Sequence, residues 1–165
     1  MDKFVIDNTW LKLHVNKICR SLSASKWCPD YIVGLTRGGL VPAVMISHWL
    51  DVPMHSLNVS LRDNSTGPES NLWMAEDAFA GKNILIVDDI NDSGSTINWI
   101  MEDWASGCFP YDERWSSIWN NNVKFAVVVD NLSSKSKVAV DYAGVEINKH
   151  EKDVWVEFPW ESWWS

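Results

Sequence analysis

Two adjacent carboxylates, Asp88 and Asp89, follow an apolar run and precede a short loop of small polar residues, 92–96. Paired carboxylates at a buried strand end repel each other and lose hydration, so they are seldom found there without a metal ion or a sugar diol to bind. The loop opens an apolar helical pattern at Ile97. Hydroxyl donors and backbone N–H groups at a helix N-terminus favour a phosphate. The loop alone could equally be an ordinary N-cap, but together with the acid pair it predicts a site for a phosphorylated sugar.

The elements that must position these groups are alternating strands and helices. Residues 84–87, ILIV, are typical of a strand buried on both faces in the middle of a parallel sheet, where ligands bind at the C-terminal strand ends. Residues 31–35, YIVGL, predict a second such strand. It is followed by Thr36-Arg37-Gly38-Gly39 and an apolar helix over residues 40–50. An Arg-Gly-Gly loop is a common turn, yet glycine also lets a backbone approach an anion, and arginine supplies forked donors.

The remaining segments predict the rest of one α/β domain. Apolar residues at helical spacing over residues 11–22 predict a covering helix, capped by Asp7, Asn8 or Thr9. Five further segments are expected: a strand over residues 54–60, a loop of about twenty residues over 61–81 that is either a functional lid or disordered, an extra turn or short helix within 106–122, and strands over 123–129 and 141–147. Four or five strands alternating with helices predict a parallel sheet with right-handed crossovers.

Composition narrows the function. The 165 residues fit a single domain spanning 1–165, and the net charge of -8 argues against nonspecific binding of nucleic acid or acidic membranes. Three widely spaced cysteines indicate neither a zinc site nor a disulfide framework, which favours a reducing, cytoplasmic location. No apolar run is long enough to span a membrane. We expect a soluble protein that binds a small anionic substrate.

Residues 84–96, ILIVDDINDSGST, resemble the phosphoribosyl pyrophosphate signature of the type I phosphoribosyltransferases. Thr36 to Gly39 resemble the pyrophosphate loop of that family, and residues 153–161 are similar to the C-terminal hood of bacterial xanthine-guanine phosphoribosyltransferases. The resemblance implies a type I phosphoribosyltransferase fold, a central mainly parallel sheet flanked by helices, with a core over about 25–147 and a small hood over about 148–165. It also implies a mobile catalytic loop after the second strand.

The activity implied by the resemblance is Mg²⁺-dependent transfer of phosphoribose from phosphoribosyl pyrophosphate to a purine base. Asp88, Asp89 and Asp92 would be the catalytic residues, with Asp92 guiding the proton of a purine ring nitrogen. The implied binding residues are Thr36, Arg37, Gly38 and Gly39 for pyrophosphate; Asp92, Ser93, Gly94, Ser95 and Thr96 for the 5'-phosphate; Asn131, Trp155 and Val156 for the base; and Asp88, Asp89 and Glu157 for the metal. The family also implies a strained or cis Thr36–Arg37 peptide bond. The expected partners are phosphoribosyl pyrophosphate, the purine base and further copies of this chain in a homodimer or homotetramer.

Two positions depart from the family pattern. Ser60-Leu61-Arg62 replaces an expected Ser-Tyr pair, and Asn131 stands where members that use 6-oxopurines have a lysine. An amide can donate to an exocyclic oxygen or accept from an amino group, so base preference stays open. Lys135 or Lys137 could reach the site from the following loop. A transferase for another base, such as a pyrimidine, and a noncatalytic regulator that senses the donor remain as alternatives, although the acidic charge disfavours a regulator that binds nucleic acid.

Overall fold

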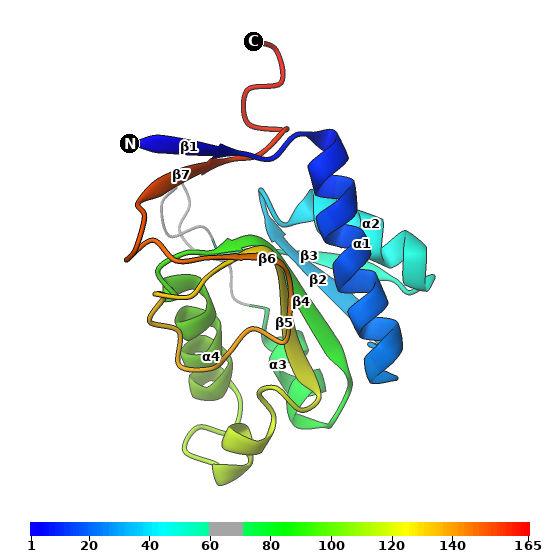
Figure 1. Ribbon diagram of the computed structural model, residues 1–165. Coiled ribbons are helices and arrows are strands. Elements are labelled where there is room, and N and C mark those ends of the chain that lie inside the picture. The colour runs from blue at the N-terminus through cyan, green and yellow to red at the C-terminus, as the bar shows by residue number, and fades with distance from the viewer. Residues whose placement is uncertain (60–70) are drawn as a thin grey trace.

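A five-stranded sheet forms the centre of the computed structural model, which describes residues 1–59 and 71–165 (Figure 1). The strand order is β3-β2-β4-β5-β6, and every neighbouring pair is parallel. The bounds are Tyr31–Thr36 for β2, Met54–Asn58 for β3, Ile84–Asn91 for β4, Val123–Asn131 for β5 and Tyr142–Ile147 for β6. The predicted parallel α/β sheet is therefore confirmed.

Helices cover both faces of this sheet. Helices α1 (Asn8–Ser25) and α2 (Leu40–Leu50) lie on one face, and α3 (Leu72–Phe79) and α4 (Ser95–Gly107) lie on the other (Figure 1). Strand β4 shows why its sequence is uniformly apolar. Ile84 and Ile86 pack with the α3 and α4 side, whereas Leu85 and Val87 pack with the α1 and α2 side.

The N-terminal helix follows its sequence pattern closely. Asp7 is the N-cap, because its side chain accepts a 2.8 Å hydrogen bond from the backbone N–H of Trp10. Leu11, Val15, Ile18, Cys19 and Leu22 form the buried face of α1. The predicted covering helix is confirmed, and of the three candidate caps the structure uses the aspartate.

The segment predicted as a long loop over residues 61–81 is partly helical. Helix α3 occupies its second half and buries Met74, Ala75 and Ala78 against the sheet. The prediction missed it because the helix has only eight residues and Asn71, its N-cap, makes no side-chain capping hydrogen bond. The end of the strand predicted over 54–60, and the Ser60-Leu61-Arg62 departure, lie outside the described residues.

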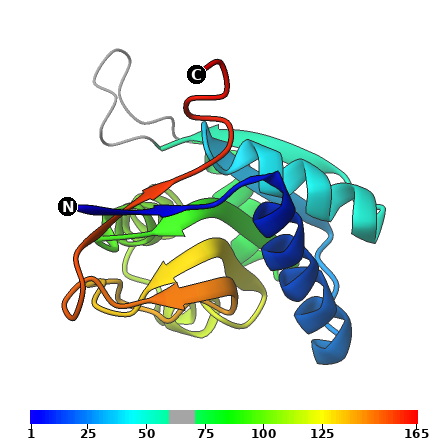
Figure 2. The ribbon, with the colours of Figure 1, turned by 45° about the horizontal axis from the view of Figure 1, so that its top comes forward.

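The hood contains both ends of the chain. Strand β7 (Val154–Glu157) pairs in parallel with β1 (Asp2–Val5) (Figure 2). The sequence predicted a hood made by the C-terminal segment alone, whereas in the structure the N-terminal strand is also part of it. Ile6 and Phe158 fix this small sheet to the core, since their exposed fractions are 1% and 2%. Among the described residues, no helix is long and apolar enough to cross a membrane.

The segment over residues 106–122 contains the short 3₁₀ helix η1 (Glu113–Ser117), as predicted. Its two tryptophans are part of the core. Trp115 is 5% exposed, donates from Nε1 to the Cys108 carbonyl at 2.8 Å, and stacks on Trp119 with ring centroids 5.7 Å apart. The segment therefore extends the hydrophobic core beyond α4.

We predict that Trp115→Ala will lower the free energy of unfolding by roughly 3–5 kcal/mol, because it leaves a cavity and removes a buried hydrogen bond. Urea denaturation followed by circular dichroism measures the change. Trp163→Ala is the control, since Trp163 is 76% exposed and should change stability by no more than about 0.5 kcal/mol. Equal effects of the two substitutions would contradict the assignment of Trp115 to the core.

Candidate active site

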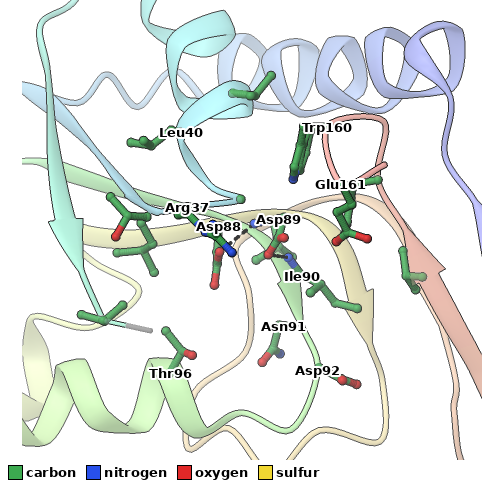
Figure 3. A pocket seen from close by; sticks show the side chains of 18 of the residues that line it. Arg37, Leu40, Asp88, Asp89, Ile90, Asn91, Asp92, Thr96, Trp160 and Glu161 are labelled. Atoms are coloured by element: carbon green, nitrogen blue, oxygen red, sulfur yellow. Dashed lines mark hydrogen bonds between the residues drawn. The ribbon is translucent and has the colours of Figure 1, made fainter. Parts of the chain in front are cut away.

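The crevice at the C-terminal ends of β2 and β4 is the natural place for a ligand in this sheet. The chain passes from β2 outward to β3 on one side, and from β4 outward to β5 on the other. This reversal of direction is a topological switch point, where the loops after the two central strands diverge and leave a crevice. A cavity of about 1270 Å³ lies there and is lined by both loops. Figure 3 shows its polar side chains.

The loop after β2 brings its backbone close to the acid pair. The Thr36–Arg37 peptide bond is cis, as the resemblance implied, and Thr36, Arg37 and Gly38 line the cavity. A Cβ atom on Gly38 would overlap the Asp89 carboxylate. Gly39 lies beneath the loop and does not line the cavity, and a Cβ there would stand 2.5 Å from the Val87 carbonyl oxygen. Only glycine permits this close approach at either position.

Asp88 and Asp89 are half-buried at the end of β4 and face the cavity together with Arg37 (Figure 3). Each carboxylate is oriented by a backbone donor. Asp88 Oδ1 accepts from the Asp89 N–H at 2.8 Å, and Asp89 Oδ1 accepts from the Ile90 N–H at 2.7 Å. Two oriented carboxylates at one edge of a cavity provide acceptors for a diol or for a hydrated cation.

The loop over residues 92–96 forms the opposite end of the cavity and leads into the N-terminus of α4. Gly94 has φ 92°, and a Cβ atom there would overlap the backbone of Ser136. The β5–β6 loop holds the loop over residues 92–96 in place, because the Lys135 N–H donates to the Ser93 carbonyl at 2.8 Å. Ser93 and Ser95 share a 2.8 Å hydrogen bond between their hydroxyls. These donors and the helix dipole suit a phosphate group.

A second set of contacts holds the base of this loop to β5. Asn91 is 5% exposed, and its Nδ2 donates to Asp130 Oδ1 at 3.0 Å and to Ser134 Oγ at 2.9 Å. Burial raises the pKa of the Asp130 carboxyl, the hydrogen bond from Asn91 opposes this shift, and the charge of Glu146 adds to it. Asn91 thus ties the end of β4 to the neighbouring strand and its loop.

The hood supplies an aromatic wall. Trp155 and Val156 line the cavity, as the resemblance implied, and Trp155 is 49% exposed. The wall continues through Trp160, which stacks on Phe158 with ring centroids 4.9 Å apart. Glu161, Trp163 and Trp164 extend it further, and the sequence assigned none of these three to the site. Half of the twelve tryptophans of the chain are exposed.

Two residues predicted to contact a ligand do not line the cavity. Asn131 is 5% exposed and is not among the residues that line the cavity; its amide donates to the Asp92 carbonyl at 2.9 Å. Glu157 also lies outside the lining, and its Oε2 pairs with Lys3 Nζ at 3.1 Å. Its place as the hood carboxylate of the cavity is taken by Glu161. Both side chains are occupied by partners distant in sequence.

The most informative residue that the sequence analysis missed is Lys149. It follows β6, lines the cavity with an 18% exposed side chain, and its Nζ lies 3.0 Å from Asp92 Oδ1 and 3.1 Å from Oδ2. Lys149 is one of two lysines in the segment NKHEKD, which carries no motif that could identify it, and the packing of β6 beside β5 brings it to Asp92. Lys135 and Lys137, the predicted candidates, are exposed and do not line the cavity.

Comparisons with known proteins agree with this geometry. Residues 6–163 match the phosphoribosyl transferase domain family. The chain is 31% identical over 134 residues to a xanthine-guanine phosphoribosyltransferase of Cereibacter sphaeroides, a match that covers 79% of this chain and 68% of the relative.

Among solved structures, a purine phosphoribosyltransferase from Pyrococcus horikoshii superposes with a TM-score of 0.68 at 27% identity, covering 98% of this chain and 96% of that one. A xanthine-guanine-hypoxanthine phosphoribosyltransferase of Helicobacter pylori has a TM-score of 0.66 at 15% identity, with coverage of 97% and 94%, which shows a shared fold. The family match over nearly the whole chain establishes that this chain belongs to the phosphoribosyltransferase family.

Proposed function

We propose that this phosphoribosyltransferase transfers the 5-phosphoribosyl group of phosphoribosyl pyrophosphate to a ring nitrogen of a purine base and releases pyrophosphate. The observation that supports it best is that one cavity combines a phosphate loop, a carboxylate pair, an arginine-glycine loop and an aromatic wall. Each corresponds to one part of the two substrates. The names of the similar bacterial and archaeal proteins support a purine as the acceptor.

The donor would lie across the switch point. Residues 92–96 and the N-terminus of α4 would bind the 5'-phosphate, Asp88 and Asp89 would accept from the ribose hydroxyls, and the Arg37 loop would bind the pyrophosphate. As the bond between ribose C1 and the pyrophosphate oxygen breaks, positive charge develops on the ribose and negative charge on the leaving group. Carboxylates beneath the sugar and a guanidinium at the leaving group stabilise both changes, so no protein nucleophile is required.

Proton transfer completes the reaction. The purine ring nitrogen forms the new bond to ribose C1, and the base must lose one proton to return to a neutral ring. Asp92 lines the cavity between the phosphate loop and the hood, where its carboxylate can accept or guide that proton. Trp155 would hold the ring by stacking, a contact that tolerates every base because each offers a π face.

Magnesium fits this donor set. Among the described residues, no group of three or more histidine, cysteine or acidic side chains is placed to hold a metal ion. Mg²⁺ usually takes one or two carboxylates and fills its other positions with water and substrate phosphates. Asp88 and Asp89 supply those carboxylates, and bound Mg²⁺ would neutralise charge on the departing pyrophosphate. Asp92 and Glu161 are the other carboxylates that line the cavity.

The cysteines and the exposed side chains of α2 support proposals about location and assembly. Cys19, Cys28 and Cys108 are all free thiols, which supports a reducing, cytoplasmic location.

Val44 and Trp49 of α2 are 42% and 48% exposed, which supports association of copies as a homodimer or homotetramer. Sedimentation of the purified protein measures that assembly directly.

The deciding experiment is a panel of bases. Adenine, hypoxanthine, guanine, xanthine, uracil and orotate are each incubated with phosphoribosyl pyrophosphate and Mg²⁺, and pyrophosphate release is measured with and without a chelator. The proposal expects release with at least one purine and its loss on chelation. Release with a pyrimidine alone would identify a transferase for another base, and donor binding without release on any base would favour a noncatalytic regulator.

We predict that Asp88→Asn combined with Asp89→Asn will lower the turnover number by on the order of 10²–10³-fold, because two charges that stabilise the ribose transition state are lost. Pyrophosphate release measures turnover, and circular dichroism confirms that the fold is kept. Asp153→Asn, an exposed position outside the cavity, is the control and should leave turnover unchanged. Near-normal turnover of the double variant would disprove the role of the acid pair.

Two glycines test the phosphate loop. Gly94 and Gly81 have nearly equal φ angles, 92° and 95°, but a Cβ at Gly81 would meet no atom within 4 Å. Alanine should cost each position about 1–2 kcal/mol of backbone strain. Only Gly94→Ala should also displace the phosphate loop from Ser136, and it should raise the Michaelis constant for the donor at least about tenfold. A matching rise in Gly81→Ala would show that lost stability, and not the loop, is responsible.

Trp155→Ala should raise the Michaelis constant for every accepted purine, because base stacking on an aromatic ring contributes roughly 1–3 kcal/mol. Initial rates at saturating donor measure it. Trp49→Ala is a matched control, since Trp49 is 48% exposed and lies outside this cavity. An unchanged constant in Trp155→Ala would remove the hood from the base site and leave only the donor site.

A further inference from the structure

We infer that two asparagines, Asn91 and Asn98, are positioning residues that set the affinity of the site for a 5'-phosphate. They stand on either side of the phosphate loop, residues 92–96, and both hold it against the segment 134–137 of the β5–β6 loop. We call the two asparagines and this segment the clamp. The inference rests on the proposed function, because the phosphate belongs to the donor and to the nucleotide product.

The phosphate loop has little structure of its own. The hydroxyls of Ser93 and Ser95 share a 2.8 Å hydrogen bond, and the Ser95 N–H donates to Ser93 Oγ at 3.2 Å. Gly94 lies between them with φ 92°, and glycine is the residue with the largest conformational freedom. A loop of this composition loses entropy when it binds a phosphate unless other elements already hold it.

Asn98, in the first turn of α4, holds the segment that lies opposite Gly94. Its Nδ2 donates to the Lys135 carbonyl at 3.0 Å, and its Oδ1 accepts from the Lys137 N–H at 2.7 Å. These two bonds flank Ser136, whose backbone a Cβ atom on Gly94 would overlap. The backbone N–H of Asn98 also donates to the Gly94 carbonyl at 3.1 Å. One residue therefore holds both sides of the contact between the loop and the segment.

Asn91 reaches the same segment from the other end of the loop. It is the last residue of β4, and its Nδ2 donates to Ser134 Oγ at 2.9 Å and to Asp130 Oδ1 at 3.0 Å. Ser134 Oγ in turn shares a 3.2 Å hydrogen bond with Ser136 Oγ. Because Asn91 is only 5% exposed, its amide needs these partners. The segment that Asn98 holds by its backbone is thus also held through its serine side chains.

The clamp serves one part of the substrates. Asn98 and Ser134 do not line the cavity, so changing them removes no group that faces a ligand. The Arg37 loop follows β2 and the Trp155 wall belongs to β7, so both are built on other elements. Loosening the clamp should therefore weaken every ligand that carries a 5'-phosphate, and it should spare inorganic pyrophosphate and the free base.

Asn98→Ala tests the clamp, because it removes both side-chain bonds and alanine suits a helix. Titration calorimetry with ribose 5-phosphate measures the phosphate site without turnover, and we expect its Kd to rise at least about tenfold. The Michaelis constant for phosphoribosyl pyrophosphate and the inhibition constant of inosine monophosphate should rise by a similar factor. The inhibition constant of inorganic pyrophosphate and the Michaelis constant for the base should stay within about twofold.

Asn122→Ala is the matched control. Asn122 is partly buried, as Asn98 is, and its Nδ2 donates to the carbonyls of Ala78 and Lys82, both at 2.9 Å, outside the cavity. Each substitution removes two hydrogen bonds to the backbone, so thermal unfolding should show similar losses of stability in the two variants. Only Asn98→Ala should lose affinity for ribose 5-phosphate.

Ser134→Ala tests the other end of the clamp, since it removes one acceptor of the Asn91 amide and leaves that buried side chain in place. It should also raise the Kd for ribose 5-phosphate. Because both ends hold one segment, releasing either end frees most of it, and the double variant with Asn98→Ala should lose less than the product of the two single losses. A loss equal to that product would mean that the residues act independently, and would overturn the clamp.

The outcomes separate this inference from the proposed function. Wild-type affinity for ribose 5-phosphate in Asn98→Ala would overturn the clamp, and so would an equal loss in Asn122→Ala or an equal rise of the constants for pyrophosphate and base. None of these results touches the transferase activity of the wild type. A wild type that releases no pyrophosphate with any purine would overturn the proposed function alone, and the binding of ribose 5-phosphate would still decide the clamp.

Discussion

The structure depends on the burial of β4 on both faces. The side chains of Ile84 to Val87 pack against helices on both faces of the sheet, so this strand can present polar groups only where it ends. Its neighbour β2 is under the same constraint. Because the chain leaves these two strands in opposite directions, their terminal loops diverge at one point and form the walls of a single cavity. The loop after β2 and the acid pair at the end of β4 are thus adjacent for a reason of topology before any reason of chemistry.

Close packing then fixes what these loops can contain. Gly38 and Gly94 have no room for a side chain, one because of the Asp89 carboxylate and the other because of the backbone of Ser136. In both places the glycine lets two segments that are distant in sequence come into contact. The phosphate loop is therefore oriented by the β5–β6 loop as well as by α4, through the Lys135 N–H and the two hydrogen bonds of the Asn98 side chain. A rigid anion site needs such bracing, since its donors must already point at the phosphate.

How far the sequence could predict this arrangement depended on the range of each interaction. The run 84–96 and the loop after β2 were predictable, because strand, loop and helix chemistry are contiguous there. Asn131, Glu157 and Lys149 were not. Asn131 was assigned to the base although its amide bonds to two distant backbones, and Glu157 was assigned to a metal although β1 brings Lys3 to it. The β1–β7 pairing joins the two ends of the chain, and neither four-residue strand has enough pattern to reveal it.

Asn131 ends β5 and Lys149 follows the neighbouring strand β6, and both contact Asp92, Asn131 through the Asp92 carbonyl and Lys149 through the carboxylate. The end of β5 and the end of β6 are neighbours in a parallel sheet, so an ammonium can reach the same cavity from either strand. When it comes from β6, the residue at the end of β5 becomes available to hold the backbone, and an asparagine suits that task because it donates and accepts at once. The acidic charge of the chain, -8 in total, makes this local placement of cations necessary. A protein whose overall field repels anions binds them only where an arginine, a lysine or a helix N-terminus is held directly against the ligand.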